Sequence, residues 1–584
     1  MNNSLFGESG IQLTLFLILL PILVALLIAA VKLYATYLRL KKKQTLFRYG
    51  KNLDKISPEE IEKFRKRQEE LDYHLPENAL SGALPVADNK GIISNVNVVD
   101  QLRIIPEKQS VQRQQYVSKY LSKLILYFLG SAIFWLIIGT SVGEYLGIKF
   151  VAPDVDHVSW LSFGRLRPVH TNMVFWGWAS LAMVGLAYYV IPRVSNIRIF
   201  SLKIGYYSLY LMNAAVIFGT ISLMAGINNA GGEYREYIWP IMALFAIGVA
   251  LSLYNFLKTI ASRTTSEIYV ANWYIVSAMM YILVIAITAY LPFWQDGLGE
   301  TITQGYYMHQ GVGMWFMFLT LGLMYYFLPQ QLNKPIYSYS LGILAFWTQI
   351  LFYTALGSHH FIFSAIPWWL QTVAIVCSVG MVIPVVAGTT NFLLTFNGAW
   401  YKLKTSYTLP FYLIGIIMYF TGSMQGTVEA FRFTNLIWHF TDFTVAHSHL
   451  TMYGIITFML WAFIYTLVPR LTGKEPHKTW VGIHFWLALI GMLLYTISLM
   501  IGSTEKGLLW IANKPFVEGL VAMAPYWLWR AIGGTMMWIS HFIFAYNFYT
   551  MVNNKEEIFA PTTPAEVLEA KIRQTNQEFN TTKN

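Results

Sequence analysis

Six histidines lie in four short segments of a strongly apolar chain, each at or near the end of a long apolar run. A histidine inside an apolar span is costly to bury and by default indicates a functional site. One such residue has about even odds of being only a hydrogen-bonded member of a helix bundle, but coincidence is a poor explanation for six. The six are His170, His309, His359, His360, His447 and His449.

The spacing of these histidines predicts metal ligation. His447 and His449 are two residues apart, so on a helix they point to nearly opposite faces and can serve two separate centres. His359 and His360 are about 100° apart on a helix and can converge on one ion near a helix end. His309, on another span, can supply a third imidazole. Three imidazoles with an open position suit copper, zinc or iron.

An opposed pair of histidines from two spans would ligate a six-coordinate haem. His170, at the start of its span, lies at a similar depth to His449 and could form such a pair. His447 alone would leave a five-coordinate haem with one open face, and a metal held by three histidines could lie opposite that face. Reduction of a diatomic gas is the chemistry that needs two metals in this arrangement.

Tyr353 is a candidate donor of a proton and an electron. It precedes His359 by six residues on the same span, and a buried tyrosine beside a metal could donate both to an O–O bond. The chain has 37 tyrosines, so a core or interfacial role is a strong alternative for Tyr353 taken alone.

The elements that carry these residues are membrane spans. Of the 584 residues, 55% are hydrophobic and 12% are charged, whereas soluble domains carry about 25% charged residues. Apolar runs of about 20 residues or more can cross a bilayer core of about 30 Å. They exclude a soluble enzyme and a disordered or nucleic-acid-binding chain. The single cysteine, Cys377, excludes an internal disulfide and covalent attachment of a c-type haem.

Each apolar run should be helical, because lipid offers no partners for backbone N–H and C=O groups. We therefore predict an all-α polytopic membrane protein. The predicted spans are 12–35, 122–147, 168–191, 204–226, 238–259, 268–292, 305–329, 339–358, 369–396, 407–428, 444–468, 480–503 and 522–550.

Basic residues predict the orientation of these spans. The first span is followed by a basic stretch at 39–51, and later loops alternate between many and few Lys and Arg residues. By the positive-inside rule the richer loops are cytoplasmic, so the histidine segments lie toward the outer face. The predicted domains are an N-terminal membrane anchor (1–38), a polar cytoplasmic connector (39–120), the helical core (121–552) and a polar C-terminal tail (553–584).

Nine segments carry a family resemblance. They are SFGRLRPVHTN (162–172), IYVANWY (268–274), GYYMHQGVG (305–313), KPIYSY (334–339), FYTALGSHH (352–360), NGAWYKLKT (397–405), FTDFTVAHSHL (440–450), VPRL (468–471) and GIHFWLALIGMLLY (482–495). Together they resemble the catalytic subunit of haem-copper oxygen reductases, specifically the cbb3-type cytochrome c oxidases. The likeness runs from about residue 120 to 552. Twelve of the predicted spans then look like the family's twelve-helix core, with the first span as an extra helix.

The resemblance implies two haems b, one low-spin and one high-spin, and one copper ion, Cu-B. By residue, the low-spin haem would be held by His170 and His449, the high-spin haem by His447, and the copper by His309, His359 and His360. Tyr353 matches the family tyrosine that is covalently joined to the copper ligand here numbered His309. Oxygen would bind between the high-spin iron and the copper, and Tyr353 would supply a hydrogen atom as the O–O bond breaks.

Charged residues of the outer loops also gain expected roles. Arg165 and Arg167 precede His170 on the side where haem propionates should lie, and guanidinium–carboxylate pairs would fix the haem and tune its potential. Glu233 matches a family glutamate near a calcium ion that bridges propionates. A solvated loop carboxylate is the alternative interpretation of Glu233.

The resemblance also implies partners and a location. Membrane-anchored c-type cytochrome subunits would deliver electrons, because this chain cannot bind haem c covalently. Soluble cytochrome c or a quinol-oxidising complex would feed them. We expect a multi-pass protein of the bacterial cytoplasmic membrane that takes up cytoplasmic protons, pumps protons and binds no nucleic acid.

The sequence departs from the family pattern in two places near the expected site. Gln425 stands where the family usually has a glutamate near the proximal histidine, and a neutral amide should raise the haem potential. On the proton path of the family, Tyr339 is kept. Gly342 replaces an expected serine and Ala345 an expected histidine. Two nearby polar side chains, together with water, are the expected substitutes: Thr348 and Gln349.

Two alternatives remain open from the sequence. A nitric oxide reductase of the same superfamily usually has a glutamate four residues after the first non-haem ligand, where this chain has Gly313. A membrane transporter with structural histidines would show broken helices or charges at mid-membrane. The spans carry few such charges, and their histidines cluster near one face.

Overall fold

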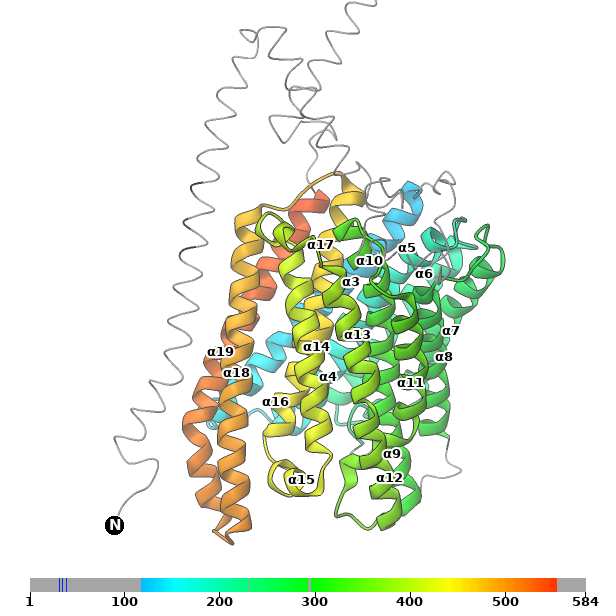
Figure 1. The fold of residues 1–584 in the computed structure, drawn as a ribbon. Coiled ribbons are helices and arrows are strands. Elements are labelled where there is room, and N and C mark those ends of the chain that lie inside the picture. The colour runs from blue at the N-terminus through cyan, green and yellow to red at the C-terminus, as the bar shows by residue number, and fades with distance from the viewer. Residues whose placement is uncertain are drawn as a thin grey trace, which may run out of the picture.

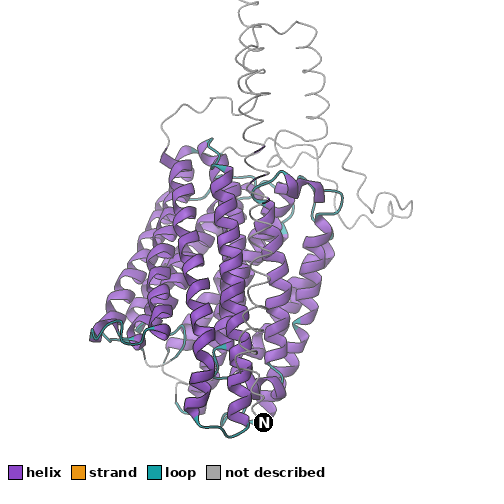
Figure 2. Ribbon diagram, turned by 90° about the vertical axis from the view of Figure 1, so that its left-hand side faces the viewer, coloured by secondary structure: helices purple, strands orange, loops and turns teal. Residues whose placement is uncertain are grey.

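The computed structural model describes residues 117–229, 232–291 and 296–553, together with Val31, Tyr34 and Leu38. In these ranges every regular element is a helix, which confirms the all-α prediction (Figure 2). The predicted C-terminal tail lies outside the described residues, except Asn553. The same holds for the connector up to residue 116 and for the anchor apart from the three single residues.

Ten helical segments of the described chain are long and apolar enough to cross a membrane, and α14 and α19 stand beside them in the bundle (Figure 1). Three spans consist of two α-helices joined by a short π-helix. The elements are α3 (Lys119–Val151), α4 (Phe163–Asn172), η6 (Met173–Ala179), α5 (Ser180–Val194), α6 (Leu202–Met224), α7 (Trp239–Ala261), α8 (Val270–Tyr290), α9 (Leu298–Gln310), η8 (Gly311–Met317), α10 (Phe318–Leu332), α11 (Tyr339–Leu356), η9 (Gly357–Phe361), α12 (Trp368–Gly380), α13 (Val382–Thr395), α14 (Leu409–Glu429), α15 (Arg432–Trp438), α16 (Phe443–His449), η11 (Leu450–Thr457), α17 (Phe458–Thr472), α18 (Lys478–Ile511) and α19 (Phe516–Asn553).

The three composite spans form the centre of the bundle. Their apolar stretches are 94%, 94% and 89% buried for 163–194, 298–332 and 443–472, whereas the other spans range from 33% to 67%. A helix that is apolar all round must be covered by other helices. Figure 1 places α4, α9 and α16 in one half of the bundle and α5, α10 and α17 in the other. The central spans are therefore shielded from lipid.

A π-helical segment follows a histidine in each central span. η6 begins three residues after His170, η8 two residues after His309, and η11 directly after His449. π-helical turns widen the backbone locally and occur frequently at functional sites. The sequence pattern did not predict them, because a span buried on all sides carries no periodic signal.

Close contact between α9 and η9 depends on two glycines. A Cβ atom on Gly357 would lie 2.4 Å from the carbonyl oxygen of Gly305, and a Cβ on Gly305 would lie 2.9 Å from that of Gly357. Any larger residue would push the two backbones apart. The glycine pair therefore holds the end of the α11 span against α9.

Several helices extend beyond the predicted spans. α4 begins at Phe163 rather than near residue 168, so His170 lies two turns inside a helix and not at its start. α18 runs to Ile511 and α19 from Phe516 to Asn553. Hydropathy marks the stretch that lipid can cover, whereas the helix continues as long as its backbone bonds and packing allow.

Candidate functional site

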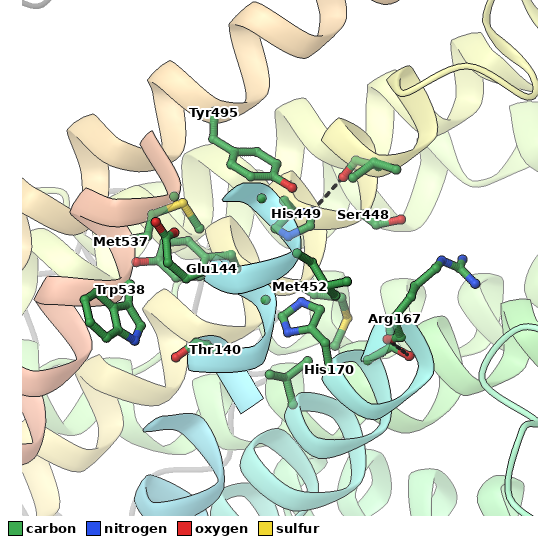
Figure 3. A pocket seen from close by; sticks show the side chains of 18 of the residues that line it. Thr140, Glu144, Arg167, His170, Ser448, His449, Met452, Tyr495, Met537 and Trp538 are labelled. Carbon is green, nitrogen blue, oxygen red and sulfur yellow. Dashed lines mark hydrogen bonds between the residues drawn. The ribbon is translucent and has the colours of Figure 1, made fainter. Parts of the chain in front are cut away.

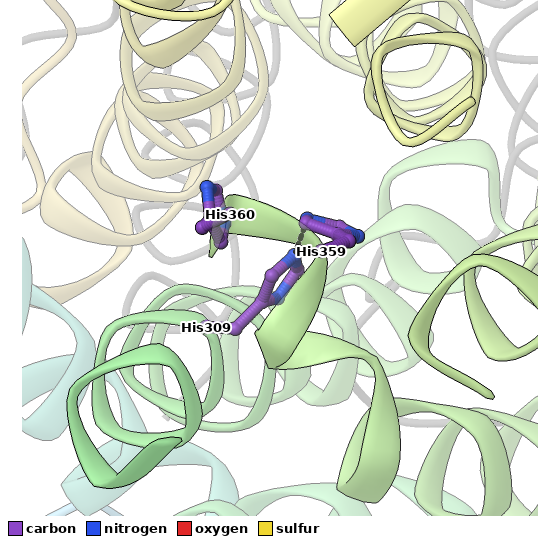
Figure 4. A group of neighbouring side chains, drawn as sticks. All are labelled: His309, His359 and His360. Carbon is purple, nitrogen blue, oxygen red and sulfur yellow. Dashed lines mark hydrogen bonds between the residues drawn. The ribbon is translucent and has the colours of Figure 1, made fainter. Parts of the chain in front are cut away.

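Three histidines from two spans converge on one point near one end of the bundle. His309 comes from α9, and His359 and His360 come from η9 (Figure 4). One ligand atom from each lies within 4.8 Å of the others, and the Nε2 atoms of His309 and His359 are 3.0 Å apart. An Nε2–H of one ring can donate to the bare Nε2 of the other at this distance, and three ring nitrogens this close together also suit a shared metal ion.

Ser378 of α12 orients His359. Its hydroxyl donates to the carbonyl of Ala374 at 2.8 Å, so it can accept the Nδ1–H of His359 at 2.6 Å. That bond leaves Nε2 of His359 with a free lone pair for a metal. Nδ1 of His309 is buried without a hydrogen-bond partner among the described residues. Sequence reasoning missed Ser378, which is one of many serines in apolar helices.

Tyr353 lies beside the histidine cluster, where Gly313 makes room for it. The ring centroids of Tyr353 and His309 are 4.9 Å apart, at an interplanar angle of 67°. A Cβ atom built on Gly313 would lie 1.7 Å from Cε1 of Tyr353. Any side chain at position 313, a glutamate included, is therefore incompatible with Tyr353 in this position.

His170 and His449 face each other from α4 and α16 (Figure 3). Their ring centroids are 6.4 Å apart and their planes differ by 13°. His170 Nδ1 is bonded to the carbonyl of Gly139 at 2.7 Å, and His449 Nδ1 to that of Val445 at 2.8 Å. Each carbonyl accepts an Nδ1–H, so both Nε2 atoms are left with free lone pairs. The separation leaves space for one flat ligand between the rings.

The pair opens into a large cavity. Its volume is about 390 Å³, and it is lined by residues of α3, α4, α16, α18 and α19. Gly143 of α3 is needed there, since a Cβ atom on it would lie 2.4 Å from Cε1 of His170. The lining includes the charged side chains Glu144, Arg167, Glu233, Asp442 and Arg530.

His447 points away from this cavity, toward α14. Its Nδ1 is 2.9 Å from Oε1 of Gln425 and 3.6 Å from a carboxylate oxygen of Glu429. One helix therefore presents two histidines to two different places. Glu429 was not predicted, because it lies just beyond the predicted span 407–428.

Comparison with known proteins gives the family. Residues 123–536 match the family model described as Cytochrome C and Quinol oxidase polypeptide I. The chain belongs to this family, the haem-copper oxidases. It is 31% identical to the cbb3-type cytochrome c oxidase subunit CcoN1 of Stutzerimonas stutzeri, over 74% of this chain and 95% of that one. It is also 31% identical to a cytochrome c oxidase subunit 1 homolog of Agrobacterium tumefaciens, over 74% and 83%.

A solved structure supports the fold. A heme-copper terminal oxidase dimer determined by cryo-EM superposes with a TM-score of 0.63 at 16% identity, covering 76% of this chain and 85% of that one. The predicted resemblance to cbb3-type cytochrome c oxidases is thus confirmed. Membership of the family implies haem and copper, oxygen as substrate and a location in a membrane.

The described residues fit the haem and copper that this family carries. Three convergent imidazoles, one of them oriented by Ser378, suit copper. The nearly parallel His170–His449 pair beside a cavity suits a haem with two axial histidines. His447, oriented by Gln425, suits a haem with one protein ligand.

The two predicted propionate arginines lie in different environments. Arg167 lines the cavity beside His170 and His449 and forms an ion pair with Glu233. Arg165 instead donates to the carbonyl of Met224 at 2.9 Å and is not among the lining residues.

Two carboxylates lie in the loop before α7. Glu236 accepts from Asn172 at 2.9 Å, and burial raises the pKa of its carboxyl group. The calcium role of Glu233 stays a prediction.

Arg530 of α19 is a cavity residue that sequence reasoning missed. It is 8% exposed and donates from Nε to the hydroxyl of Tyr495 at 3.1 Å. Asp442 lies 3.9 Å from Arg530 and 3.6 Å from Lys506, so two cations share one carboxylate. A charged residue within an apolar span was the available signal for Arg530.

The structure separates the residues predicted for a proton path on α11. Gln349 is buried and donates to the carbonyl of Gly313 at 3.3 Å, beside the histidine cluster. Thr348 donates to the carbonyl of Leu344 in its own helix at 2.6 Å. It shares an outward face with Leu344 and Leu351, which are 44% and 66% exposed. Tyr339 lies at the start of the helix, with its ring 5.9 Å from that of Tyr269.

We expect a Gly313→Ala variant to lose copper and activity. The new methyl group would force the ring of Tyr353 to move, because the two would collide. The contact between Tyr353 and His309 would then be lost. Gly311→Ala is the matched control, because its Cβ would meet no atom within 4 Å, and alanine favours helix by about 1 kcal/mol. Copper analysis of both purified variants checks this. Equal copper content in the two would contradict the packing argument.

Proposed function

We propose that this chain is the catalytic subunit of a terminal respiratory oxidase that reduces O2 to water with electrons from c-type cytochromes. The observation that carries the proposal is the contact between Gly313 and Tyr353 beside the three histidines. A nitric oxide reductase usually has a glutamate at the position of Gly313, and any side chain there would collide with Tyr353.

The proposed cofactors are a low-spin haem b, a high-spin haem b, one copper and a calcium ion. When bound, the high-spin haem and the copper would supply the metals that bind and reduce oxygen. The low-spin haem would lie between His170 and His449, and the copper among His309, His359 and His360. The calcium would lie near Glu233, with the Arg167 guanidinium group toward the propionates, whereas Arg165 would hold the loop after α6 through the carbonyl of Met224.

The side chains of the chain would then orient ligands and hold protons. Ser378 fixes the ring of His359, and Gln425 fixes that of His447. The phenol of Tyr353, which is partly buried, would hold a proton beside His309. Gln349 lies between α11 and η8 and reaches the same region, so the proton route on α11 would pass Tyr339 and Gln349 rather than Thr348.

The proposed partners are membrane-anchored c-type cytochrome subunits, supplied by cytochrome c or a quinol-oxidising complex, in a bacterial cytoplasmic membrane. The proton consumption and proton pumping of the enzyme would charge this membrane. Oxygen uptake by the complex in vesicles, driven by reduced cytochrome c, tests the activity. Uptake with protons consumed from the cytoplasmic side supports it, and nitric oxide uptake without oxygen uptake would contradict it.

A Gln425→Glu variant is expected to lower the potential of the high-spin haem. A carboxylate in place of the amide would hold the His447 Nδ1–H more strongly and make the imidazole more electron-donating. A change of about 1.4 kcal/mol in this bond corresponds to roughly 60 mV. Redox titration of the haem absorbance measures the shift. Glu429→Gln is the control, because it removes the carboxylate that already lies near His447. An upward shift of the haem potential in Gln425→Glu would contradict the proposed role of Gln425.

A further inference from the structure

Glu144 is the only acidic residue of α3, a helix long and apolar enough to cross a membrane. Lys149, the next basic residue of this helix, is paired with Asp156 at 2.5 Å, and none of the ion pairs between described residues includes Glu144. A carboxylate in an apolar span is costly to bury and by default indicates a functional site. The proposed oxygen chemistry gives Glu144 no role, so its presence requires an explanation.

The carboxylate of Glu144 faces the cavity that contains His170 and His449 (Figure 3). Gly534 of α19 leaves room for it, because a Cβ atom at that position would lie 2.9 Å from Oε2 of Glu144. The same point is 3.9 Å from the ring of Tyr495, and the ring centroids of Tyr495 and His449 are 4.4 Å apart. The packing of α19 against α3 therefore provides a place for this carboxylate in the wall of the cavity.

Thr535 can form a hydrogen bond with Glu144 whether or not the carboxyl group carries a proton. Its hydroxyl oxygen lies 2.5 Å from Oε1 of Glu144 and 2.9 Å from the carbonyl oxygen of Ala531. A hydroxyl group has one proton and two lone pairs. When Glu144 is ionised, Thr535 donates to the carboxylate. When Glu144 is protonated, the acid donates to Thr535, and the hydroxyl proton of Thr535 turns to the carbonyl of Ala531. Both states therefore keep Glu144 and Thr535 hydrogen-bonded.

The other charged groups of the cavity have partners of opposite charge. On the side of α4, Arg167 forms an ion pair with Glu233. On the side of α19, Arg530 lies 3.9 Å from Asp442, which directly precedes α16. Among the described residues, Glu144 is therefore the charged lining residue without a counter-ion of its own.

The remaining titratable side chains of the lining are three histidines and three tyrosines, namely His170, Tyr234, His449, Tyr453, Tyr495 and His541. A tyrosine has an ordinary pKa of about 10 and is already protonated near neutral pH. His170 and His449 are the proposed axial ligands. A proton on His541 would add a charge to a side chain that is 1% exposed, whereas a proton on Glu144 removes a charge. Glu144 is therefore the favoured acceptor of a proton in this cavity.

We propose that Glu144 takes up a proton when the haem held between His170 and His449 is reduced, and releases it when the haem is oxidised. Reduction adds a negative charge to the cavity, and a negative charge in low-dielectric surroundings opposes an ionised carboxylate nearby. The electron comes from the proposed c-type cytochromes and the proton from the aqueous phase. An O–H bond forms on Glu144 at reduction and breaks at oxidation, so the net charge of the cavity stays constant.

This inference rests on the proposed low-spin haem, but it does not depend on which gas the enzyme reduces. Two measurements on the purified complex test it, and both follow the low-spin haem itself rather than turnover. Absence of a low-spin haem from the native complex would refute the proposed function and this inference with it. The outcomes that follow concern a complex that contains the haem, so they overturn the role of Glu144 alone.

Redox titration of the low-spin haem at several pH values measures the coupling. The potential should fall as the pH rises, by up to about 59 mV per pH unit, because a tenfold change in proton concentration changes a one-electron equilibrium tenfold. Glu144→Gln mimics the protonated acid, so it should lose most of this dependence and keep the higher potential of acidic pH. Glu505→Gln is the matched control, since Glu505 lies on α18 outside the cavity lining. The same pH dependence in Glu144→Gln and in the native complex would overturn the proposal.

Infrared difference spectra of the reduced and oxidised complex identify the group that takes up the proton. A C=O stretching band of a protonated carboxyl group should appear on reduction, shift in D₂O and be lost in Glu144→Gln. Thr535→Val should keep the band but move its frequency, because the acid O–H loses its acceptor. An unchanged low-spin haem spectrum shows that each variant has folded. A reduced complex without such a band, or a band that survives in Glu144→Gln, would overturn the proposal.

Discussion

A Tyr353→Phe variant is expected to lose oxygen reduction by about 10²–10⁴-fold, the contribution of a positioned proton donor. Phenylalanine keeps the ring that packs beside His309, whose centroid is 4.9 Å away, and removes only the hydroxyl group. The histidines and Gly313 are untouched, so copper and both haems should remain. The loss would therefore come from the chemistry and not from a disrupted site.

Oxygen uptake by the purified complex, together with copper and haem analysis, measures this effect. Tyr412→Phe is the matched control, because its buried hydroxyl bonds to Thr466 at 3.0 Å, between α14 and α17. That variant should keep most of its turnover. If Tyr353→Phe reduces oxygen as fast as the control, Tyr353 has no catalytic role.

His449→Leu and His447→Leu are expected to remove different haems, although the two residues are two positions apart. His449 faces His170 with parallel rings, whereas His447 is held by Gln425 on the other side of the helix. His449→Leu should abolish the low-spin haem spectrum and leave the high-spin haem. His447→Leu should do the reverse. Both should reduce oxygen uptake to background, since electron entry and oxygen binding are each lost.

Visible and magnetic circular dichroism spectra of the two variants distinguish the haems. His477→Leu serves as the control, because His477 is exposed at the start of α18 and makes no capping hydrogen bond there. Both haems should survive that change. Loss of the same haem in His447→Leu and His449→Leu would contradict the separation of the two sites.

The histidines and the span pattern could be predicted from the sequence for a physical reason. Only 12 histidines occur in 584 residues, and burying one in an apolar span is costly without a function. The presence and spacing of the histidines therefore predicted metal sites. The structure brings His309, His359 and His360 within reach of one ion. Composition likewise predicted a multi-pass helical protein.

Other parts of the site depend on contacts between distant segments. Glu429 approaches His447 across two spans, and Ser378 reaches His359 from the next helix. No local pattern specifies such pairs. Arg530 could have been noticed as a charge within an apolar span, but its place in the cavity follows only from the packing of α19 against α3 and α18.

The interpretation of α11 shows a different limit of sequence patterns. Thr348 and Gln349 are adjacent polar residues in an apolar span, and the sequence predicted the same role on a proton path for both. In the structure Gln349 faces the histidine cluster, while Thr348 lies on the outward face and bonds to its own helix. Hydropathy cannot tell which face of a fully apolar helix contacts lipid, since both faces have the same character.

Metal analysis of the purified complex, with oxygen and nitric oxide uptake measured on the same sample, tests the proposed function most directly. The structure places three imidazoles around one ion and gives the neighbouring position to Tyr353 rather than to a glutamate. We predict about one copper per two non-covalent haems b and rapid oxygen uptake. Non-haem iron in place of copper, with nitric oxide consumed instead of oxygen, would contradict the oxygen-reductase assignment.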